Sequence, residues 1–136
     1  MRYAVATLLG EADTHYLQTH VTMGCELVLI GDWNISRSVL DAYPRLRTEG
    51  PHALARAMFN ETFMPALDVV DVFRERHPEA REFTWFNKTT PAGKLDAARV
   101  DFALVSRSLL PRVLDVHISD RRFHSDHAPV HLKVAE

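Results

Sequence analysis

The sequence predicts a single α/β domain with a mixed β-sheet and flanking helices, and three observations lead to that prediction. The chain of 136 residues is 46% hydrophobic and 25% charged, which is ordinary globular usage and enough for one buried core. Helix-type and strand-type segments alternate in the first half, whereas strand-type segments dominate the second half. No linker or low-complexity segment divides the sequence, so residues 1–136 are expected to form one unit.

The first half predicts the order strand, helix, strand, helix. Residues 2–9 are short and apolar, as in a strand, and Asp13 is a candidate N-cap for a helix that Gly24 would end. Residues 26–30 are apolar without alternation, which is the pattern of a strand covered on both faces. A second helix is expected over residues 50–63, with its proline in the first turn, where proline is tolerated.

The second half predicts four strands, at residues 81–86, 99–106, 113–118 and 129–134. Alternation along the second of these sends Val100, Phe102 and Leu104 to the core. The same alternation leaves Asp101 and Arg99 together on the other face. Asp71 and Trp85 are expected to have structural roles, as a turn cap and a core residue.

Polar residues suited to phosphodiester chemistry follow the predicted buried strand. Asp32 and Asn34 come directly after it, where α/β folds place ligand-binding groups, and their spacing on an extended segment points them the same way. A carboxylate can position or deprotonate water, and a neutral amide can hold a phosphoryl oxygen without repelling it. Taken alone, this segment is better explained as an ordinary strand-end turn rich in Gly, Asp and Asn, and only the two later blocks favour the functional interpretation.

Asp101 lies among small and apolar neighbours, where an ionised carboxylate needs a partner. That partner is either Arg99 or a backbone amide, in a structural role, or a histidine whose tautomer and charge the carboxylate sets. Asp126 and His127 lie in the loop before the last predicted strand. From this loop they could reach both a divalent cation and a phosphate. A zinc site is not indicated, because the spacing of the eight histidines and the single cysteine matches no known pattern.

Three blocks, taken in order, carry a family resemblance. They read Leu-Ile-Gly-Asp-Trp-Asn at 29–34, Ala-Arg-Val-Asp-Phe at 98–102 and Ser-Asp-His-Ala-Pro-Val at 125–130. Together they resemble the C-terminal half of the endonuclease/exonuclease/phosphatase superfamily, and most closely its abasic-site and LINE-retrotransposon endonuclease branch. The resemblance implies about half of a four-layer α/β/β/α sandwich, which acts on DNA.

The resemblance assigns a role to each polar residue of these blocks. Asp32 would activate water, and Asp101 would orient His127. Asn34 and His127 would hold the phosphoryl oxygens, so both count as catalytic and as substrate-binding residues. Asp126 would help to anchor Mg²⁺ or Mn²⁺, since Mg²⁺ usually takes one or two protein carboxylates beside water and phosphate oxygens.

The resemblance weakens toward the start of the chain. Tyr3 stands where the family has a phosphate-contacting tyrosine, but Val5 replaces the proline that belongs after it. The half of the fold that this chain is expected to lack supplies the principal metal-binding glutamate. Neither Glu11, which precedes a helix cap, nor Glu26, which enters a buried strand, is expected to replace it.

Two functions of different classes follow. The first is a Mg²⁺-dependent DNA endonuclease that is complete only with a partner or within a longer parent protein. The second is a non-catalytic relic or assembly module that binds through an exposed sheet face. Only one face of the sheet has predicted helices to cover it, so the expected partners are DNA, a two-fold copy of the chain, or the missing N-terminal half.

Composition restricts the other possibilities. The formal net charge of −2 provides no global attraction to nucleic acid, so DNA binding would depend on a local basic surface and on metal. Cys25 is the single cysteine, which excludes an intramolecular disulfide, and we expect both Cys25 and His131 to lie outside the site. No apolar run reaches the roughly 20 residues of a membrane span, and no signal peptide is visible. An intracellular protein, nuclear or cytoplasmic, is therefore expected.

Overall fold

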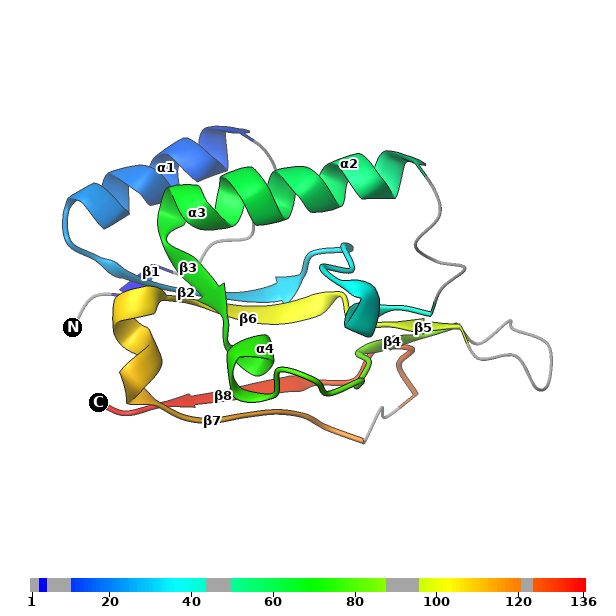
Figure 1. Cartoon of the computed structure of the whole chain (residues 1–136). Helices are drawn as coiled ribbons and strands as arrows, with labels where there is room; N and C mark the ends of the chain where they lie inside the picture. Colours follow the sequence, from blue (N-terminus) through cyan, green and yellow to red (C-terminus); the bar gives the residue numbers. More distant parts are fainter. Residues whose placement is uncertain (1–2, 5–10, 44–49, 88–95, 121–123) are drawn as a thin grey trace.

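A computed structural model describes residues 3–4, 11–43, 50–87, 96–120 and 124–136, and it has the α/β architecture that the sequence predicts (Figure 1). A central sheet has four strands in the order β1 (Tyr3–Ala4), β2 (Glu26–Asp32), β6 (Asp101–Ser106) and β3 (Val69–Asp71). β1 runs parallel to β2, whereas β6 is antiparallel to β2 and β3, so the sheet is mixed. Of the expected strand at 2–9, residues 2 and 5–9 lie outside the described residues.

One face of the central sheet is covered by helices (Figure 1). These are α1 (Glu11–Thr22), α2 (Gly50–Met58), the π-helical turn η3 (Phe59–Phe63) and α3 (Met64–Leu67). The core between helices and sheet contains Leu17, Leu29, Phe59 and Phe102. No helix in the described part of the chain is long and apolar enough to cross a membrane.

The helix boundaries differ in part from the expected ones. Gly24, with φ of 80°, follows the end of α1 as expected, but α1 begins at Glu11, so Asp13 is not its N-cap. An acidic residue is favoured both at the N-cap and in the first turn, and sequence alone does not separate these positions. The second helical segment continues past residue 63, because Met64 N–H bonds to the Phe59 carbonyl in a π-turn and Pro65 has no N–H to satisfy.

The other face of the central sheet is covered in part by a β-hairpin. The sequence predicts its two strands but does not indicate that they form a layer of their own. β7 (Val113–Ile118) and β8 (Val130–Val134) pair with each other and pack Val113 and Val116 against Val70 and Val105. Strand β6 is therefore buried on both faces, whereas alternation predicted a single core face. At the far end of β2, Ile30 stays 42% exposed.

Short elements connect these layers. They are η1 (Val39–Asp41), α4 (Val72–Arg76), β4 (Trp85–Phe86), β5 (Ala97–Ala98) and η4 (Arg107–Arg112). The expected strand at 81–86 is thus reduced to two residues, and β6 starts at Asp101 instead of residue 99. The reason is that Arg99 N–H donates to the Asp41 carbonyl, and Val100 N–H donates to Thr84 Oγ1 at 3.0 Å.

Candidate functional site

Two carboxylates meet at one end of the central sheet. β2 ends at Asp32, β6 begins at Asp101, and these two residues are direct partners in the antiparallel pairing. Residues that are directly opposite in such a pair project their side chains on the same face. Buried Thr84 holds the start of β6, because its hydroxyl oxygen accepts hydrogen bonds from the amides of Val100 and Asp101.

His127 completes this group from the segment that precedes β8. Its Nδ1 lies 2.9 Å from Asp101 Oδ2, and its backbone N–H donates to Ser125 Oγ at 3.0 Å. One ligand atom of each of Asp32, Asp101 and His127 lies within 4.8 Å of the others. Of the two partners considered for Asp101, the histidine is therefore the one present, and its Nε2 is left to contact other groups.

The electrostatic surroundings favour the protonated form of His127. Partial burial is the largest single influence and lowers the pKa of His127, because it disfavours the charged imidazolium. The hydrogen bond and charge of Asp101, with the charges of Asp32 and Asp126, act in the opposite direction and raise the pKa above its usual 6.5. The imidazole side chain is 33% exposed, so it is accessible from the solvent.

Asn34 reaches the same place by a turn, not by the extended segment that was expected. Its backbone has φ of 52°, in the left-handed region that asparagine tolerates better than most residues. Its N–H donates to Asp32 Oδ1 at 2.8 Å, and the preceding Trp33 N–H donates to the Val100 carbonyl at 2.9 Å. The turn thus ties Asn34 to Asp32 and to the start of β6.

A cleft of about 250 Å³ opens beside this group. It is lined by Asp32, Asn34, Ile35, Ser36, His52, Arg56, Trp85, Ala98, Val100 and His127. His52 and Arg56 come from α2, so an arginine and an imidazole stand in a cleft that also holds a carboxylate. Arg56 Nε donates a hydrogen bond to the Ser36 carbonyl. Sequence reasoning missed both residues, because a basic residue in an amphipathic helix usually lies on a solvated face.

Trp85 is half-buried and lines this cleft as well as packing against Ala42, Ala98 and Val100. The expectation that it is a core residue therefore describes only part of its surroundings. A tryptophan at a cleft offers an apolar surface beside the polar group, which suits the contact of a sugar or a base.

The other predicted residues are placed differently. Asp126 is next to His127 in the chain, and its charge acts on His127, but its carboxylate is not in the group within 4.8 Å. Tyr3 pairs with Glu26 at the start of β2, whereas Asp32 ends that strand. Six strand residues correspond to roughly 20 Å, so this backbone register does not bring Tyr3 to the cleft.

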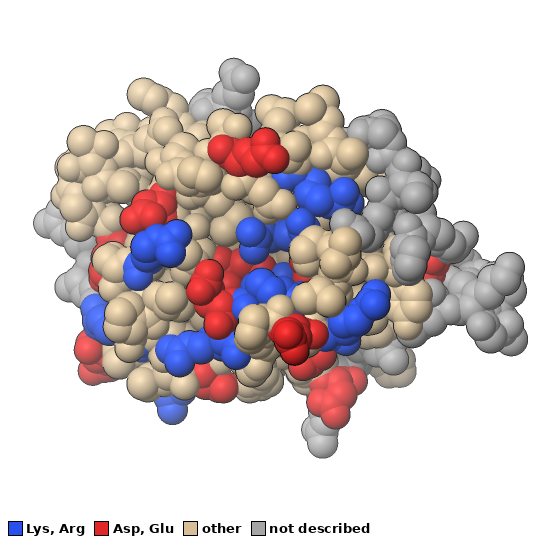
Figure 2. All heavy atoms as spheres, in the orientation of Figure 1, with Lys and Arg blue, Asp and Glu red and all other residues tan. Residues whose placement is uncertain are grey.

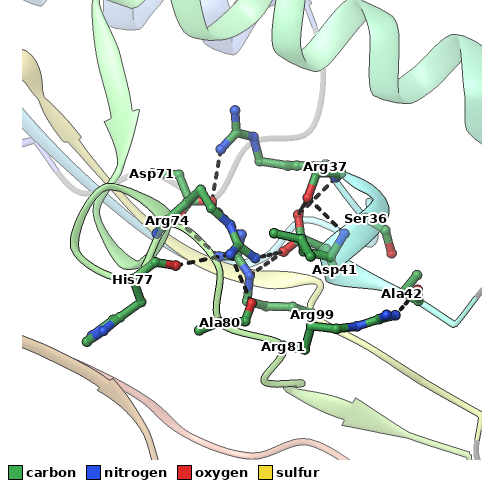
Figure 3. Close-up of polar contacts among 12 residues, drawn as sticks. Ser36, Arg37, Asp41, Ala42, Asp71, Arg74, His77, Ala80, Arg81 and Arg99 are labelled. Atoms are coloured by element: carbon green, nitrogen blue, oxygen red, sulfur yellow. Dashed lines mark hydrogen bonds and ion pairs between the residues drawn. The ribbon is translucent and has the colours of Figure 1, made fainter.

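Arg99 also departs from its expected position on the Asp101 face. It is fully buried and bonds to Asp41 and Asp71 instead (Figure 3). Asp71 does cap a turn, as expected, because its carboxylate accepts from the Arg74 N–H at the start of α4. The second role of Asp71, as the partner of Arg99, was not expected.

The donor set at the strand ends fits a hard divalent cation. Asp32 and Asp101 offer carboxylate oxygens, which Mg²⁺ and Mn²⁺ prefer, and Asp126 follows in the adjacent segment. Two carboxylates and an imidazole beside a cleft that also holds an arginine are the groups needed to bind a phosphate and to activate water.

Comparisons with known proteins show which solved structures and which curated protein this chain resembles. No family model matches the sequence. The 3′–5′ exonuclease NExo from Neisseria meningitidis is 31% identical with a TM-score of 0.76, over 90% of this chain and 50% of that one. An AP endonuclease from Archaeoglobus fulgidus is 25% identical with a TM-score of 0.72, over 91% of this chain and 51% of its own.

A second NExo structure, described as a 3′ phosphatase bound to a product DNA hairpin, is 29% identical with a TM-score of 0.77. Recombination repair protein 1 from Drosophila melanogaster is 27% identical over 107 residues, which are 76% of this chain and 16% of that protein. The chain therefore spans about half the length of the solved structures and a small part of the Drosophila protein.

Proposed function

We propose that the chain carries part of the active site of a metal-dependent DNA nuclease. The premise is that its structural neighbours are AP endonucleases and 3′ exonucleases of the endonuclease/exonuclease/phosphatase superfamily. The observation that carries the proposal is that Asp32, Asp101 and His127 converge within 4.8 Å and that two of them, Asp32 and His127, line one cleft. The reaction is hydrolysis, in which water adds to phosphorus and the bond from phosphorus to one sugar oxygen breaks.

Each residue has a task that its geometry supports. Asp32 positions the attacking water and accepts its proton. Asp101 holds His127 Nδ1, so that the charged ring presents Nε2–H to a phosphoryl oxygen. Asn34 supplies a neutral amide donor to the same phosphate.

The carboxylates of Asp32, Asp101 and Asp126 are the groups that would hold Mg²⁺ or Mn²⁺. A bound cation of this kind would neutralise the negative charge that develops on the phosphoryl oxygens. The family resemblance places a further ligand, a glutamate, in the other half of the fold, so we expect weak metal binding by this chain alone.

The substrate side of the cleft is assigned to Arg56, His52 and Trp85. On the face drawn in Figure 2, Lys and Arg gather in several patches below the helical layer, interleaved with Asp and Glu. No single-sign field covers that face, which agrees with the net charge of −2. Contacts to a polyanion are therefore local, and Arg56 is the nearest such contact to the reacting group.

Nicking of supercoiled plasmid DNA tests the proposal. We expect Mg²⁺-dependent nicking by the chain, supplied with its N-terminal half where needed, and a loss of about 10²–10³-fold in Asp32→Asn and in His127→Gln. Asp68→Asn is the matched control, because Asp68 is an exposed residue on a left-handed turn and its salt bridge to Arg107 is on the surface. Nicking that survives EDTA, or equal rates for Asp32→Asn and wild type, would contradict the proposal.

A second candidate, an assembly module, is favoured by the incomplete cover of the second sheet face. Ile30 is 42% exposed and adjoins a shallow hollow with Gly31, Pro129 and Val130. Asp101 and His127 line the same hollow, so a partner seated on it would also cover the candidate site. A two-fold copy of this face is self-complementary, and a stable dimer would bury at least about 1,000 Å². We expect light scattering of the purified chain to give a mass above the monomer. A compact monomer that binds no hydrophobic dye would contradict this candidate.

A further inference from the structure

The largest fully buried side chain of the described core is a charged one. Arg99 is 0% exposed, and Asp41 and Asp71, which flank it, are 1% and 2% exposed. Arg99 Nε donates to Asp41 Oδ1 at 2.8 Å, while its two terminal nitrogens donate to the two oxygens of Asp71 at 3.0 and 2.7 Å. This is the bidentate arrangement in which arginine fixes both the distance and the plane of a carboxylate.

Two more arginines extend this group, which we call the arginine cluster: Arg37, Asp41, Asp71, Arg74 and Arg99 (Figure 3). Arg37 Nη1 donates to Asp71 Oδ2 at 2.9 Å, and Arg74 Nη2 donates to Asp41 Oδ1 at 2.7 Å. Three positive and two negative charges therefore share one mostly buried volume. A buried ion cluster is weak evidence for stability, since well-packed apolar residues often serve as well. Its directional bonds require another explanation.

The positions of the cluster residues in the chain suggest that explanation. Arg37 and Asp41 belong to the loop that follows Asn34, and Arg99 lies two residues before Asp101. Asp71 Oδ2 accepts from both Arg37 and Arg99, so one oxygen atom joins the loop to the start of β6.

Backbone hydrogen bonds also join these two segments, at two points. Arg99 N–H donates to the Asp41 carbonyl at 2.6 Å, and Trp33 N–H donates to the Val100 carbonyl at 2.9 Å. The loop at residues 33–41 is thus tied to residues 99–100 near Asn34 and again at the arginine cluster.

We propose that the arginine cluster is a positioning element for the cleft, which holds the loop of Asn34 and the strand of Asp101 at a constant separation. Asp71, Asp41 and Arg99 act through these segments and do not touch the substrate. The geometric part of this inference stands on its contacts alone, whereas its consequence for rate rests on the proposed function.

The test is the substitution Arg99→Lys, which keeps the charge but loses the planar fork that binds Asp71 with two hydrogen bonds and Asp41 with a third. Two NMR signals report the site without substrate or metal: the Asn34 amide, which is bonded to Asp32, and the His127 ring proton at Nδ1, which is bonded to Asp101. We expect the first to shift and the second to be lost in the folded variant. In the nicking assay described above, kcat should fall by about 10²-fold with little change in KM. This is the effect expected when a catalytic group is misplaced by about 1 Å.

Two controls separate positioning from general destabilisation. Arg107→Lys makes the same chemical change in an exposed pair with Asp68, and Leu109→Ala destabilises the hairpin-side core without removing a hydrogen bond of the arginine cluster. Both should leave the two signals in place. If Arg99→Lys does not fold, Arg37→Gln tests the outer arm, whose side chain is 20% exposed, and the Asn34 amide should still shift.

Unchanged signals in the folded variants, or equal changes in Leu109→Ala, would overturn the inference. An inactive wild-type protein would instead overturn the proposed function, and the NMR signals would still decide the positioning role.

Discussion

Two groups of carboxylates in this chain have opposite surroundings. Asp41 and Asp71 are buried and accept hydrogen bonds from three arginines, so their oxygens are occupied (Figure 3). Asp32 and Asp101 stand at a cleft, where Asp101 accepts from one histidine and Asp32 from a backbone amide. The first arrangement uses aspartate to hold segments together, and the second keeps carboxylate oxygens available for water or a cation.

The titration behaviour follows this difference. Burial by itself raises the pKa of Asp41, but the charges and hydrogen bonds of Arg99 and Arg74 outweigh burial and lower it. In the cleft the carboxylates act on a histidine instead, and they raise the pKa of His127. Arginines thus favour the ionised form of Asp41, while the carboxylates of the site favour the protonated form of His127.

The largest expected effect concerns the buried group. Asp71→Ala leaves Arg99 buried without its bidentate partner, and the loss of one partner from a buried ion pair costs about 3–5 kcal/mol. Urea denaturation should therefore show a severe loss of folding free energy, while Asp68→Asn, in an exposed pair, stays within about 0.5 kcal/mol of wild type. A loss below about 1 kcal/mol for Asp71→Ala would remove the contrast between the two groups.

A smaller effect is expected from Asp101→Asn, which sharpens the comparison by pH. Because the folded-state pKa of His127 is raised, protonation of His127 contributes stability that is present below about pH 6.5 and is lost as pH rises through the raised value. Removing the Asp101 charge should lower the pKa of His127, as followed by NMR titration without metal. Asp115→Asn is the control, because Asp115 pairs with His117 on the exposed hairpin. An unchanged His127 titration would show that Asp101 does not set its charge.

The smallest effects are expected outside both groups. Cys25 is half-buried before β2, and His131 stacks on His117 on the hairpin at a ring distance of 4.6 Å. Cys25→Ser and His131→Gln should each change stability by about 0.5 kcal/mol or less and leave Mg²⁺-dependent nicking unchanged. Loss of nicking in either folded variant would mean that the site has been misassigned.

Much of the cleft was predictable from sequence because its residues follow short strands. The strand at 26–30 and the strand that carries Asp101 were recognised from runs of apolar residues, and the glycine stop of α1 from Gly24. The three-block resemblance then named Asp32, Asp101 and His127, which the structure brings within 4.8 Å. The hairpin at β7 and β8 was found as two strands but not as a separate layer, since alternation does not say which sheet a strand joins.

The sequence by itself determined the helices and strands that have a clear period, and the polar residues at their ends, because such signals arise between near neighbours in the chain. The tertiary structure alone decided that Arg99 leaves the Asp101 face for Asp41 and Asp71, which are 58 and 28 residues away. An ion pair between residues so far apart in the sequence produces no periodic sequence pattern. Their pairing depends on which segments the packed core brings together, and burial then makes the choice of partner energetically decisive.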